Sequence, residues 1–253
     1  MTAVLIYHDV VEPHAADAVG FPGRLAGRYK HTPDAFDRHL DAIAATGRRV
    51  GLVGTGADVA LTFDDGGSSA PAIAERLERR GWRGHFFVTT ERIGTPGFAD
   101  ADALRALAAA GHDVGSHSHT HPAYMGRLAA ADIAREWKLS RERLGEVLGT
   151  PPATAALPGG YLSGAVITEA ARAGYALLMT SQPTGRSRRE GSVTVQGRYT
   201  IWGDTPASTA AAYARGARGA RLRLWVEWTL KGAAKRVTPR GYDRLRRIRA
   251  GGA

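Results

Sequence analysis

Short apolar runs alternate with longer amphipathic stretches over about the first 200 residues of the chain. The apolar runs predict strands at Ala3–Tyr7, Arg49–Val53, Val59–Phe63, His85–Thr89, Asp113–Ser116, Ala153–Leu157, Tyr175–Thr180 and Arg198–Trp202. Stretches rich in Ala, Leu and Arg predict helices at Pro33–Ala45, Ala70–Arg80, Ala101–Ala110, Ala129–Leu148, Gly164–Ala173 and Pro206–Arg215. Because strands that alternate with helices form parallel βα units, we expect an α/β fold built as a barrel or a doubly wound sheet.

Two segments depart from this alternation. Glu12–His31 is a long loop rich in Gly, Pro and His, and long loops in compact domains are often functional. In Arg221–Lys231, apolar residues fit a strand period at five of five positions and a helical period at four of five. Periodicity therefore leaves the secondary structure of this second segment open.

The composition narrows the class of protein. The length of 253 residues fits one large domain, and the lack of cysteine excludes disulfide frameworks, thiolate metal sites and cysteine nucleophiles. No apolar run approaches the roughly 18–20 residues of a membrane span. The apolar run Ala3–Tyr7 is too short for a signal peptide and lacks a preceding cationic region. We therefore expect a cytoplasmic or membrane-peripheral protein.

Charge and histidine are distributed in opposite ways. The net charge of +10 comes from residues 215–253, which hold 12 Lys and Arg against only Glu227 and Asp243. Residues 1–214 are formally neutral, with 22 basic and 22 acidic side chains. All nine histidines lie between His8 and His121. Chemistry that needs an imidazole must therefore come from the first half of the chain.

A pair of carboxylates follows the predicted strand Val59–Phe63, within the string Thr62-Phe63-Asp64-Asp65-Gly66-Gly67. Adjacent carboxylates repel, so their burial is costly unless a cation neutralises one of them. The carboxyl end of a parallel strand is also where active sites of α/β proteins form. The string taken alone fits an ordinary Asp-Gly turn equally well.

A cluster of histidines follows the predicted strand Asp113–Ser116, in the string His117-Ser118-His119-Thr120-His121-Pro122. One helical turn would place the rings of His117 and His121 on one side, whereas an extended segment would add His119 to them. Pro122 disfavours helical geometry at His121, so a turn is expected. Neutral imidazoles combined with a carboxylate suit a divalent metal such as zinc.

A third string, Ala156-Leu157-Pro158-Gly159-Gly160-Tyr161, follows another predicted strand. Its glycines could present backbone N–H groups to a developing oxyanion, and an ordinary Pro-Gly turn is the alternative. We assign Tyr161 and Trp202 to substrate binding, because an aromatic face can pack against the ring of a ligand, with core packing as the alternative for Trp202.

In this order, the motifs resemble those of the polysaccharide deacetylase family, the NodB-homology domain of carbohydrate esterase family 4. Thr62–Gly66 resembles the TFDDG motif of the family, and His117–His121 resembles its H-[ST]-x-x-H motif. Leu157–Gly160 is similar to a reduced form of its R-x-P-[YG]-G motif. Ile6–Val10 and Gly84–Val88 also resemble family segments. The resemblance covers the chain from about Ala3 to Ile201.

The resemblance implies a distorted (β/α) barrel of the NodB-homology type and the metal-dependent removal of an N-acetyl group, or less readily an O-acetyl group, from a sugar. It implies Asp65, His117 and His121 as ligands of a divalent metal, with Zn²⁺ expected, and Asp64 as the general base. This agrees with the chemistry of the residues, since a metal activates water and a carboxylate held off the metal can accept its proton. The N–H of Gly159 would share the negative charge of the intermediate.

The chain also departs from the family pattern. Ala156 stands where the family has the Arg that orients the catalytic Asp, and the family's D-x-x-x-W motif is not evident near Leu178–Gln196. The family's final L-x-x-H, which supplies the general acid, cannot exist because no His follows His121. We therefore expect the metal ligands of the family to be present and its usual general acid to be absent.

Two hypotheses address the missing acid. His8 leaves the first predicted strand at the same end of the barrel, and we assign it to the catalytic residues, with a structural role as the alternative. The second hypothesis is that Asp64 returns the proton it accepted from water to the leaving amine.

The basic tail suggests two domains, a barrel over residues 1–205 and an Arg-rich extension, helical or partly disordered, over residues 206–253. The extension could be solvated, or it could lie on an anionic membrane through Trp225, Trp228 and Leu230. Nucleic acid is not expected as a partner, because no recognised nucleic-acid-binding motif accompanies the charge.

The leading hypothesis is a metal-dependent deacetylase whose substrate is an acetylated amino sugar or glycan. The first alternative is hydrolysis of a different amide, in a lipid-linked amino sugar or a cyclic amide. The second alternative, motivated by the missing Arg and His, is a degenerate domain that binds glycan without turnover.

Overall fold

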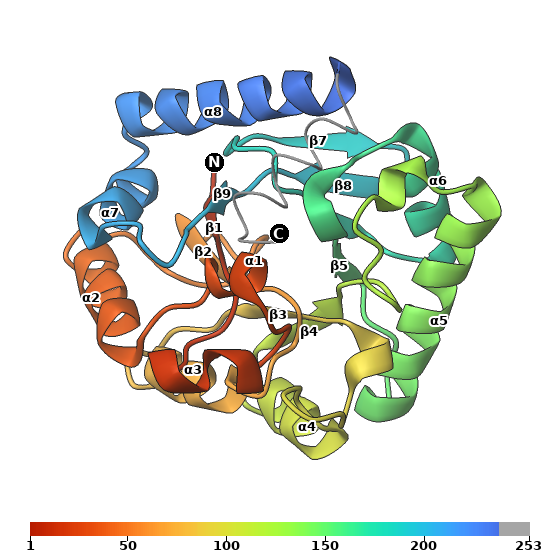
Figure 1. The fold of residues 1–253 in the computed structure, drawn as a ribbon, viewed down its shortest axis with the longest axis horizontal. Helices are drawn as coiled ribbons and strands as arrows, with labels where there is room; N and C mark the ends of the chain where they lie inside the picture. Colours follow the sequence, from red (N-terminus) through yellow and green to blue (C-terminus); the bar gives the residue numbers. More distant parts are fainter. Residues whose placement is uncertain (238–253) are drawn as a thin grey trace.

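The strands of the chain form one curled sheet in the computed structural model, which describes residues 1–237 (Figure 1). The strand order is β7-β8-β6-β5-β4-β3-β2-β1-β9, and every neighbouring pair is parallel except β7 with β8. The strands are β1 (Ala3–Tyr7), β2 (Val59–Phe63), β3 (His85–Val88), β4 (Asp113–Ser116), β5 (Thr154–Ala156), β6 (Leu177–Met179), β7 (Ser187–Glu190), β8 (Val193–Gln196) and β9 (Tyr199–Thr200). The longer helices surround the sheet on its outer side, and this confirms the predicted distorted (β/α) barrel (Figure 1).

A single stretch of chain links the two edges of the parallel sheet. β8 pairs with β6, and β9, which begins three residues later, pairs with β1. Between them, a Cβ on Gly197 would lie only 2.5 Å from the carbonyl oxygen of Gln182, so glycine alone fits this crossing without displacing backbone. The next residue, Arg198, donates its backbone N–H to the same carbonyl (2.9 Å) and is 1% exposed. The crossing therefore carries the Arg198 side chain into the barrel.

The helices are α1 (Arg24–Gly27), α2 (Pro33–Ala44), α3 (Ala70–Glu78), α4 (Ala101–Ala109), α5 (Ala130–Leu148), α6 (Gly164–Ala173), α7 (Ala207–Arg215) and α8 (Arg218–Val237). α2 begins where predicted, because the Thr32 side chain accepts a hydrogen bond from the N–H of Ala35. Its apolar face buries Phe36, Leu40 and Ile43 against the barrel. The outer layer thus follows from capping and amphipathic spacing.

The inside of the barrel is filled, and polar groups seal the end where the strands begin. Val4, Ala60, Phe87, Ala156 and Met179 form the interior apolar cluster. Three side chains at strand starts link to one another: His85 donates to Asp113 (2.6 Å), which also accepts from Thr154 (2.8 Å). The carboxyl ends of the strands, where active sites of α/β barrels form, lie at the opposite end.

The structure lacks one predicted strand and contains a hairpin that the sequence pattern does not predict. The pattern predicts a strand at Arg49–Val53, but only Val50 forms an isolated bridge, with Val59. The hairpin of β7 and β8 has no counterpart in the predictions, because the residues of β7 are polar and all exposed. A strand without an apolar face leaves no alternation to detect.

The end of the described chain is helical. α8 spans Arg218–Val237, which resolves the ambiguous period of that segment in favour of helix. Within residues 1–237, no helix combines the length and the hydrophobicity that crossing a membrane would require. The predicted extension over residues 206–253 is described to Val237 only, and residues 238–253 lie outside the described residues. The boundary placed at residue 205 stays a prediction.

Candidate active site

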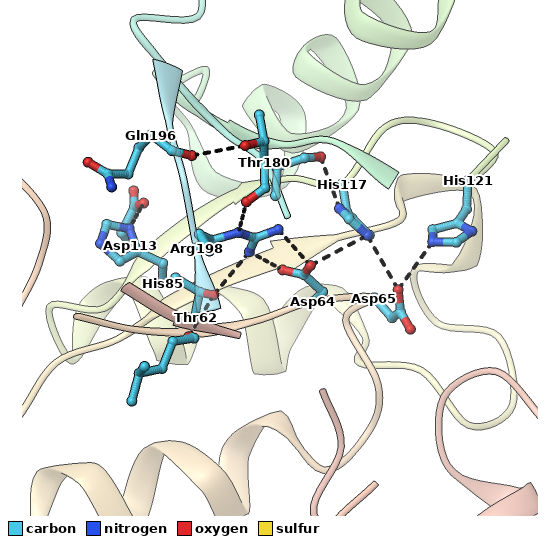
Figure 2. A network of polar contacts seen from close by, with 12 residues as sticks. Thr62, Asp64, Asp65, His85, Asp113, His117, His121, Thr180, Gln196 and Arg198 are labelled. Atoms are coloured by element: carbon cyan, nitrogen blue, oxygen red, sulfur yellow. Dashed lines mark hydrogen bonds and ion pairs between the residues drawn. The ribbon is translucent and has the colours of Figure 1, made fainter. Parts of the chain in front are cut away.

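The two adjacent aspartates lie directly after β2, at the carboxyl end of the barrel (Figure 2). Both are buried, with 6% of Asp64 and 8% of Asp65 exposed. Asp65 adopts a left-handed backbone conformation with φ of 79°, and the next residue, Gly66, has φ of 80°. This turn points neighbouring carboxylates in different directions, so each can take a different partner.

The two outer histidines of the His-rich motif face Asp65 from the loop after β4. The His117 ring donates from Nδ1 to the carbonyl oxygen of Ala156 (2.9 Å), which leaves Nε2 directed at the aspartates. His117 Nε2 lies 3.5 Å from Asp65 Oδ1, and His121 Nε2 lies 3.4 Å from the same oxygen (Figure 2). Three possible ligand atoms of these residues all lie within 4.8 Å of one another.

The spacing of these atoms fits a metal ion. Two ligand atoms at about 2.0–2.1 Å from a tetrahedral zinc ion stand roughly 3.3 Å apart. The observed separations of 3.4 and 3.5 Å match this value and exceed the length of an ordinary N–H···O hydrogen bond. Asp65 Oδ1 is buried without a hydrogen bond of its own among the described residues. The donor set of one carboxylate and two imidazoles is also one that zinc accepts.

Backbone strain is concentrated at this site. Among the described residues, the non-glycine residues with positive φ are Asp65 (79°), Ser118 (66°) and His121 (60°). All three belong to the two motifs that form the cluster of Asp65, His117 and His121. Such conformations cost about 1–3 kcal/mol each and persist where the surrounding structure holds them in place.

Glu136 of α5 holds the strained histidine loop. Its Oε2 accepts the backbone N–H groups of His119 (2.9 Å) and Thr120 (2.8 Å), and its Oε1 accepts the Thr120 hydroxyl (2.7 Å). The His119 ring lies apart from the cluster, where its Nδ1 meets the Thr90 hydroxyl (2.9 Å). The loop is therefore a turn, as Pro122 predicted, and it presents two histidines rather than three. Nothing in the sequence pattern singled out Glu136.

Arg198 supplies the guanidinium that the sequence motif lacks. Its Nη1 and Nη2 donate to the two oxygens of Asp64, at 2.7 and 2.9 Å (Figure 2). Nη1 also donates to the Thr62 hydroxyl (3.0 Å), and Nε donates to the carbonyl of Thr180 (3.2 Å). The expectation that Ala156 leaves Asp64 without an orienting arginine therefore needs correction. The arginine comes from the crossing between β8 and β9 instead of the strand β5.

The charges around the aspartates keep both carboxyls ionised. Burial alone would raise the pKa of Asp64, but the Arg198 guanidinium and His117 outweigh it and hold that pKa below its usual range. Burial opposes ionisation of Asp65 in the same way, and His121 and His8 reverse the effect. Burial lowers the pKa of His117 to about 4, so its imidazole is neutral at neutral pH, as a metal ligand must be.

His8 lies at the end of β1, close enough to lower the pKa of both aspartates by its charge. Its ring packs against Tyr29 of the Glu12–His31 loop, with centroids 4.5 Å apart. Its Nδ1 is buried and makes no hydrogen bond with the described residues. The ring is therefore held by packing, and one nitrogen has no protein partner there.

Three further predicted residues lie in rim loops. Gly159 is in the turn after β5 with φ of 65°, and a Cβ there would stand 2.3 Å from the carbonyl oxygen of Ala123. Tyr161 follows that turn and packs edge-on against Tyr124, at 4.7 Å between centroids. Trp202 follows β9 and stacks on Tyr29 at 4.5 Å. The rim thus brings Gly159, Tyr161 and Trp202 to the same end of the barrel as the aspartates.

Comparison with known proteins identifies a family that this chain resembles. The sequence model of the family described as polysaccharide deacetylase matches residues 53–178. The matched region includes the aspartates and the histidine motif, whereas His8 and Arg198 lie outside it. No significant match is found among curated protein sequences.

Solved structures share the fold at low sequence identity. The polysaccharide deacetylase BC0361 from Bacillus cereus is 19% identical, with a TM-score of 0.71 over 84% of this chain and 68% of that one. IcaB from Ammonifex degensii is 22% identical, with a TM-score of 0.67 over 85% and 97% of the two chains. The deacetylase PplD from Streptococcus pyogenes is 20% identical, with a TM-score of 0.66 over 81% and 94%.

Proposed function

This chain belongs to the polysaccharide deacetylase family, and we propose that it is a metal-dependent hydrolase that removes an N-acetyl group from an acetylated amino sugar or glycan. Family and fold support a deacetylase. One observation carries the finer proposal: Asp65, His117 and His121 converge beside a second carboxylate, that of Asp64, which Arg198 holds separately.

Asp65, His117 and His121 would hold the ion, which we propose to be zinc. A divalent ion bound there would lower the pKa of a water molecule toward neutrality and polarise the acetyl carbonyl. Hydrogen bonds within the protein preorganise these ligand side chains. Ala156 fixes the tautomer of His117, and Glu136 fixes the loop that carries His121.

Asp64 is the proposed general base. Its Oδ2 lies 3.9 Å from His117 Nε2, so the carboxylate borders the metal cluster without belonging to it. Arg198 holds both of its oxygens and keeps it ionised, and an ionised carboxylate can accept the proton of an attacking water. Arg198 is a positioning residue in this scheme, because it acts through Asp64.

Departure of the amine requires a proton. We propose that His8 donates it, since His8 lies at the same end of the barrel as Asp64 and has a buried Nδ1 without a protein partner among the described residues. The N–H of Gly159 would stabilise the oxyanion from the turn after β5. Tyr161 and Trp202 would contact the sugar from the rim of the barrel.

Metal analysis combined with acetate release tests this function. The protein should contain one zinc ion per chain and release acetate from N-acetylglucosamine oligomers. A chelator should abolish the release, and added zinc should restore it. Bound zinc without acetate from any acetylated sugar would favour the glycan-binding alternative. Release of product from a lipid-linked or cyclic amide alone would favour the alternative substrate class.

Exposed apolar side chains of α8 support a second proposal, that this surface binds an anionic membrane. Leu222, Trp225 and Val226 are 61%, 46% and 41% exposed, at helical spacing on one face. Leu222 and Trp225 line a cavity of about 530 Å³ together with Met1 and three arginines, Arg186, Arg218 and Arg221. Exposed apolar side chains among arginines suit the boundary between lipid headgroups and acyl chains. The net charge of residues 215–253 is also complementary to anionic lipid.

Vesicle sedimentation tests the α8 surface. The protein should sediment with phosphatidylglycerol vesicles and remain in solution with phosphatidylcholine vesicles. The variant Leu222→Ser/Trp225→Ser should lose most of this binding, whereas Leu139→Ser, which removes an exposed leucine from α5, should retain it. Equal sedimentation of both variants would contradict the proposal.

A further inference from the structure

Two arginines on the rim of the barrel lie over aromatic rings. One of them is connected to the candidate active site by a row of contacts between aromatic rings. The Arg28 guanidinium lies 5.0 Å from the ring centroid of Trp202. Trp202 stacks on Tyr29, and Tyr29 packs on the His8 ring, each at 4.5 Å between centroids. Arg28 is exposed. This row of contacts leads from the solvent to the proposed acid.

A second arginine stands beside the metal cluster in the same way. The Arg92 guanidinium lies 5.8 Å from the ring centroid of Phe21, and Phe21 packs on the His121 ring at 4.8 Å. Arg92 follows β3, whereas Phe21 belongs to the long loop after β1. The two arginines therefore approach the cluster from the His8 side and from the His121 side.

The loop that carries Phe21 and Arg28 is held in shape from within. Lys30 donates from Nζ to the backbone carbonyls of Ala16 (2.6 Å), Val19 (2.5 Å) and Phe21 (2.7 Å). These bonds consume the donors of the Lys30 ammonium group, so it supports the loop rather than facing a ligand. The positions of Phe21 and Arg28 are thus fixed before any ligand arrives.

The charges of Arg28 and Arg92 are not neutralised by the protein. Across the described part of the chain, no carboxylate lies within 4.0 Å of either guanidinium, although ion pairs are frequent elsewhere. Asp64 and Asp65, the carboxylates at the centre, are already matched by Arg198 and by histidines. Arg28 and Arg92 therefore present guanidinium groups without an ion-pair partner among the described residues, on rings that restrict the guanidinium planes.

From these contacts, and resting on the proposed function, we propose that the substrate is an anionic glycan. It carries a phosphate or carboxylate group on the acetylated sugar or on the neighbouring sugar, and Arg28 binds that group. Arg92 adds a second positive charge from the His121 side of the cluster. A guanidinium binds both anions through paired N–H groups, and stacking on a ring leaves its N–H edge available. Trp202, which stacks on Tyr29, then serves as the support for Arg28.

Three sugars of matched size test the proposal, each measured by calorimetric binding and by acetate release: N-acetylglucosamine, N-acetylglucosamine 1-phosphate and N-acetylmuramic acid. At least one anionic sugar should bind about tenfold more tightly than the neutral sugar at low salt, and high salt should reduce this preference. The phosphate and carboxylate arms identify which anion is recognised. Arg28→Gln should reduce the anionic-to-neutral ratio about tenfold. Arg24→Gln, at an exposed arginine of α1 in the same loop, should preserve the ratio.

The two proposals fail in different ways. Equal binding of all three sugars, or an equal loss of anionic and neutral binding in Arg28→Gln, would overturn the anionic-substrate proposal even if acetate is released. Arg28-dependent binding of an anionic sugar without any acetate release would support the subsite and overturn the deacetylase function.

Discussion

Arg198 and Asp64 form a two-bond ion pair inside the barrel, with each guanidinium Nη donating to a different carboxylate oxygen at 2.7 and 2.9 Å. The arginine is 1% exposed and the aspartate is 6% exposed. Because this pair occupies both oxygens of Asp64, it fixes the plane of the carboxylate as well as its charge. The pair explains how two neighbouring aspartates can perform different tasks.

Removal of Arg198 should therefore impair catalysis through Asp64. Breaking a buried ion pair typically costs about 3–5 kcal/mol, so Arg198→Ala should also lower the free energy of unfolding by a similar amount. We expect kcat to fall at least about 100-fold with little change in KM, because the arginine orients the base without touching the substrate. Arg198→Lys keeps the charge but loses the paired geometry, so it should be intermediate.

Arg188→Ala is the matched control for Arg198. Arg188 pairs with Glu190 at 2.7 Å on the exposed strand β7, and such surface pairs contribute about 0–1 kcal/mol. Steady-state kinetics and denaturant unfolding should find Arg188→Ala close to wild type. Equal effects of the two alanine variants would contradict the proposed role of the buried pair.

The acid hypothesis predicts a specific loss in His8→Ala. Turnover should fall about 100-fold or more, since general acid catalysis typically contributes factors of 10²–10⁴. The metal content should stay unchanged, because His8 is not part of the cluster of Asp65, His117 and His121. Parallel acetate-release assays and metal analysis check both points. Near-normal turnover in His8→Ala would leave Asp64 as the source of the proton.

Glu136→Ala should weaken the metal site from outside it. The substitution removes the acceptor of two backbone N–H groups and one hydroxyl in the strained histidine loop. Loss of such support typically costs 10–100-fold in metal affinity, which a zinc competition titration would measure. Glu146→Ala, which breaks an exposed pair with Arg143 on the same helix, serves as the control. An unchanged zinc affinity in Glu136→Ala would show that the loop holds its shape unaided.

His31 should make the fold sensitive to acid. It is 1% exposed, and burial, aided by His39 and His8, lowers its pKa from 6.5 to about 4. The unfolded chain therefore binds the proton first, so stability should fall as the pH drops from 6.5 to 4, by on the order of 3 kcal/mol for this group. Denaturant unfolding across this range should show a smaller loss in His31→Phe, whereas the exposed His14→Gln should match wild type. Identical pH dependence in all three would contradict this account.

Local pattern predicted much of the fold. β1, β2 and β4 have the predicted bounds, because each is a short run of mostly buried residues between turn signals. β7 could not be predicted in this way, since Ser187–Glu190 is exposed throughout and is defined by its pairing with β8.

Residues of the candidate site could be predicted from the sequence only where they lie close together along the chain. The aspartates and the two histidines fall within short strings, so spacing alone pointed to them. Arg198 is 134 residues from Asp64, and the two meet only because the crossing at Gly197 bends the chain into the barrel. Glu136 likewise reaches its loop from the next helix, through contacts that no motif encodes.

Asp64 and Asp65 have different proposed roles, and the zinc content of two isosteric variants distinguishes them. Native mass spectrometry should find one zinc ion per chain in the Asp64→Asn variant. The same variant should release no acetate from N-acetylglucosamine oligomers. Asp65→Asn should lose most of its zinc, because Asp65 Oδ1 faces both His117 and His121. Loss of zinc from Asp64→Asn, or full retention of zinc in Asp65→Asn, would show that the two carboxylates do not divide the roles of base and ligand in this way.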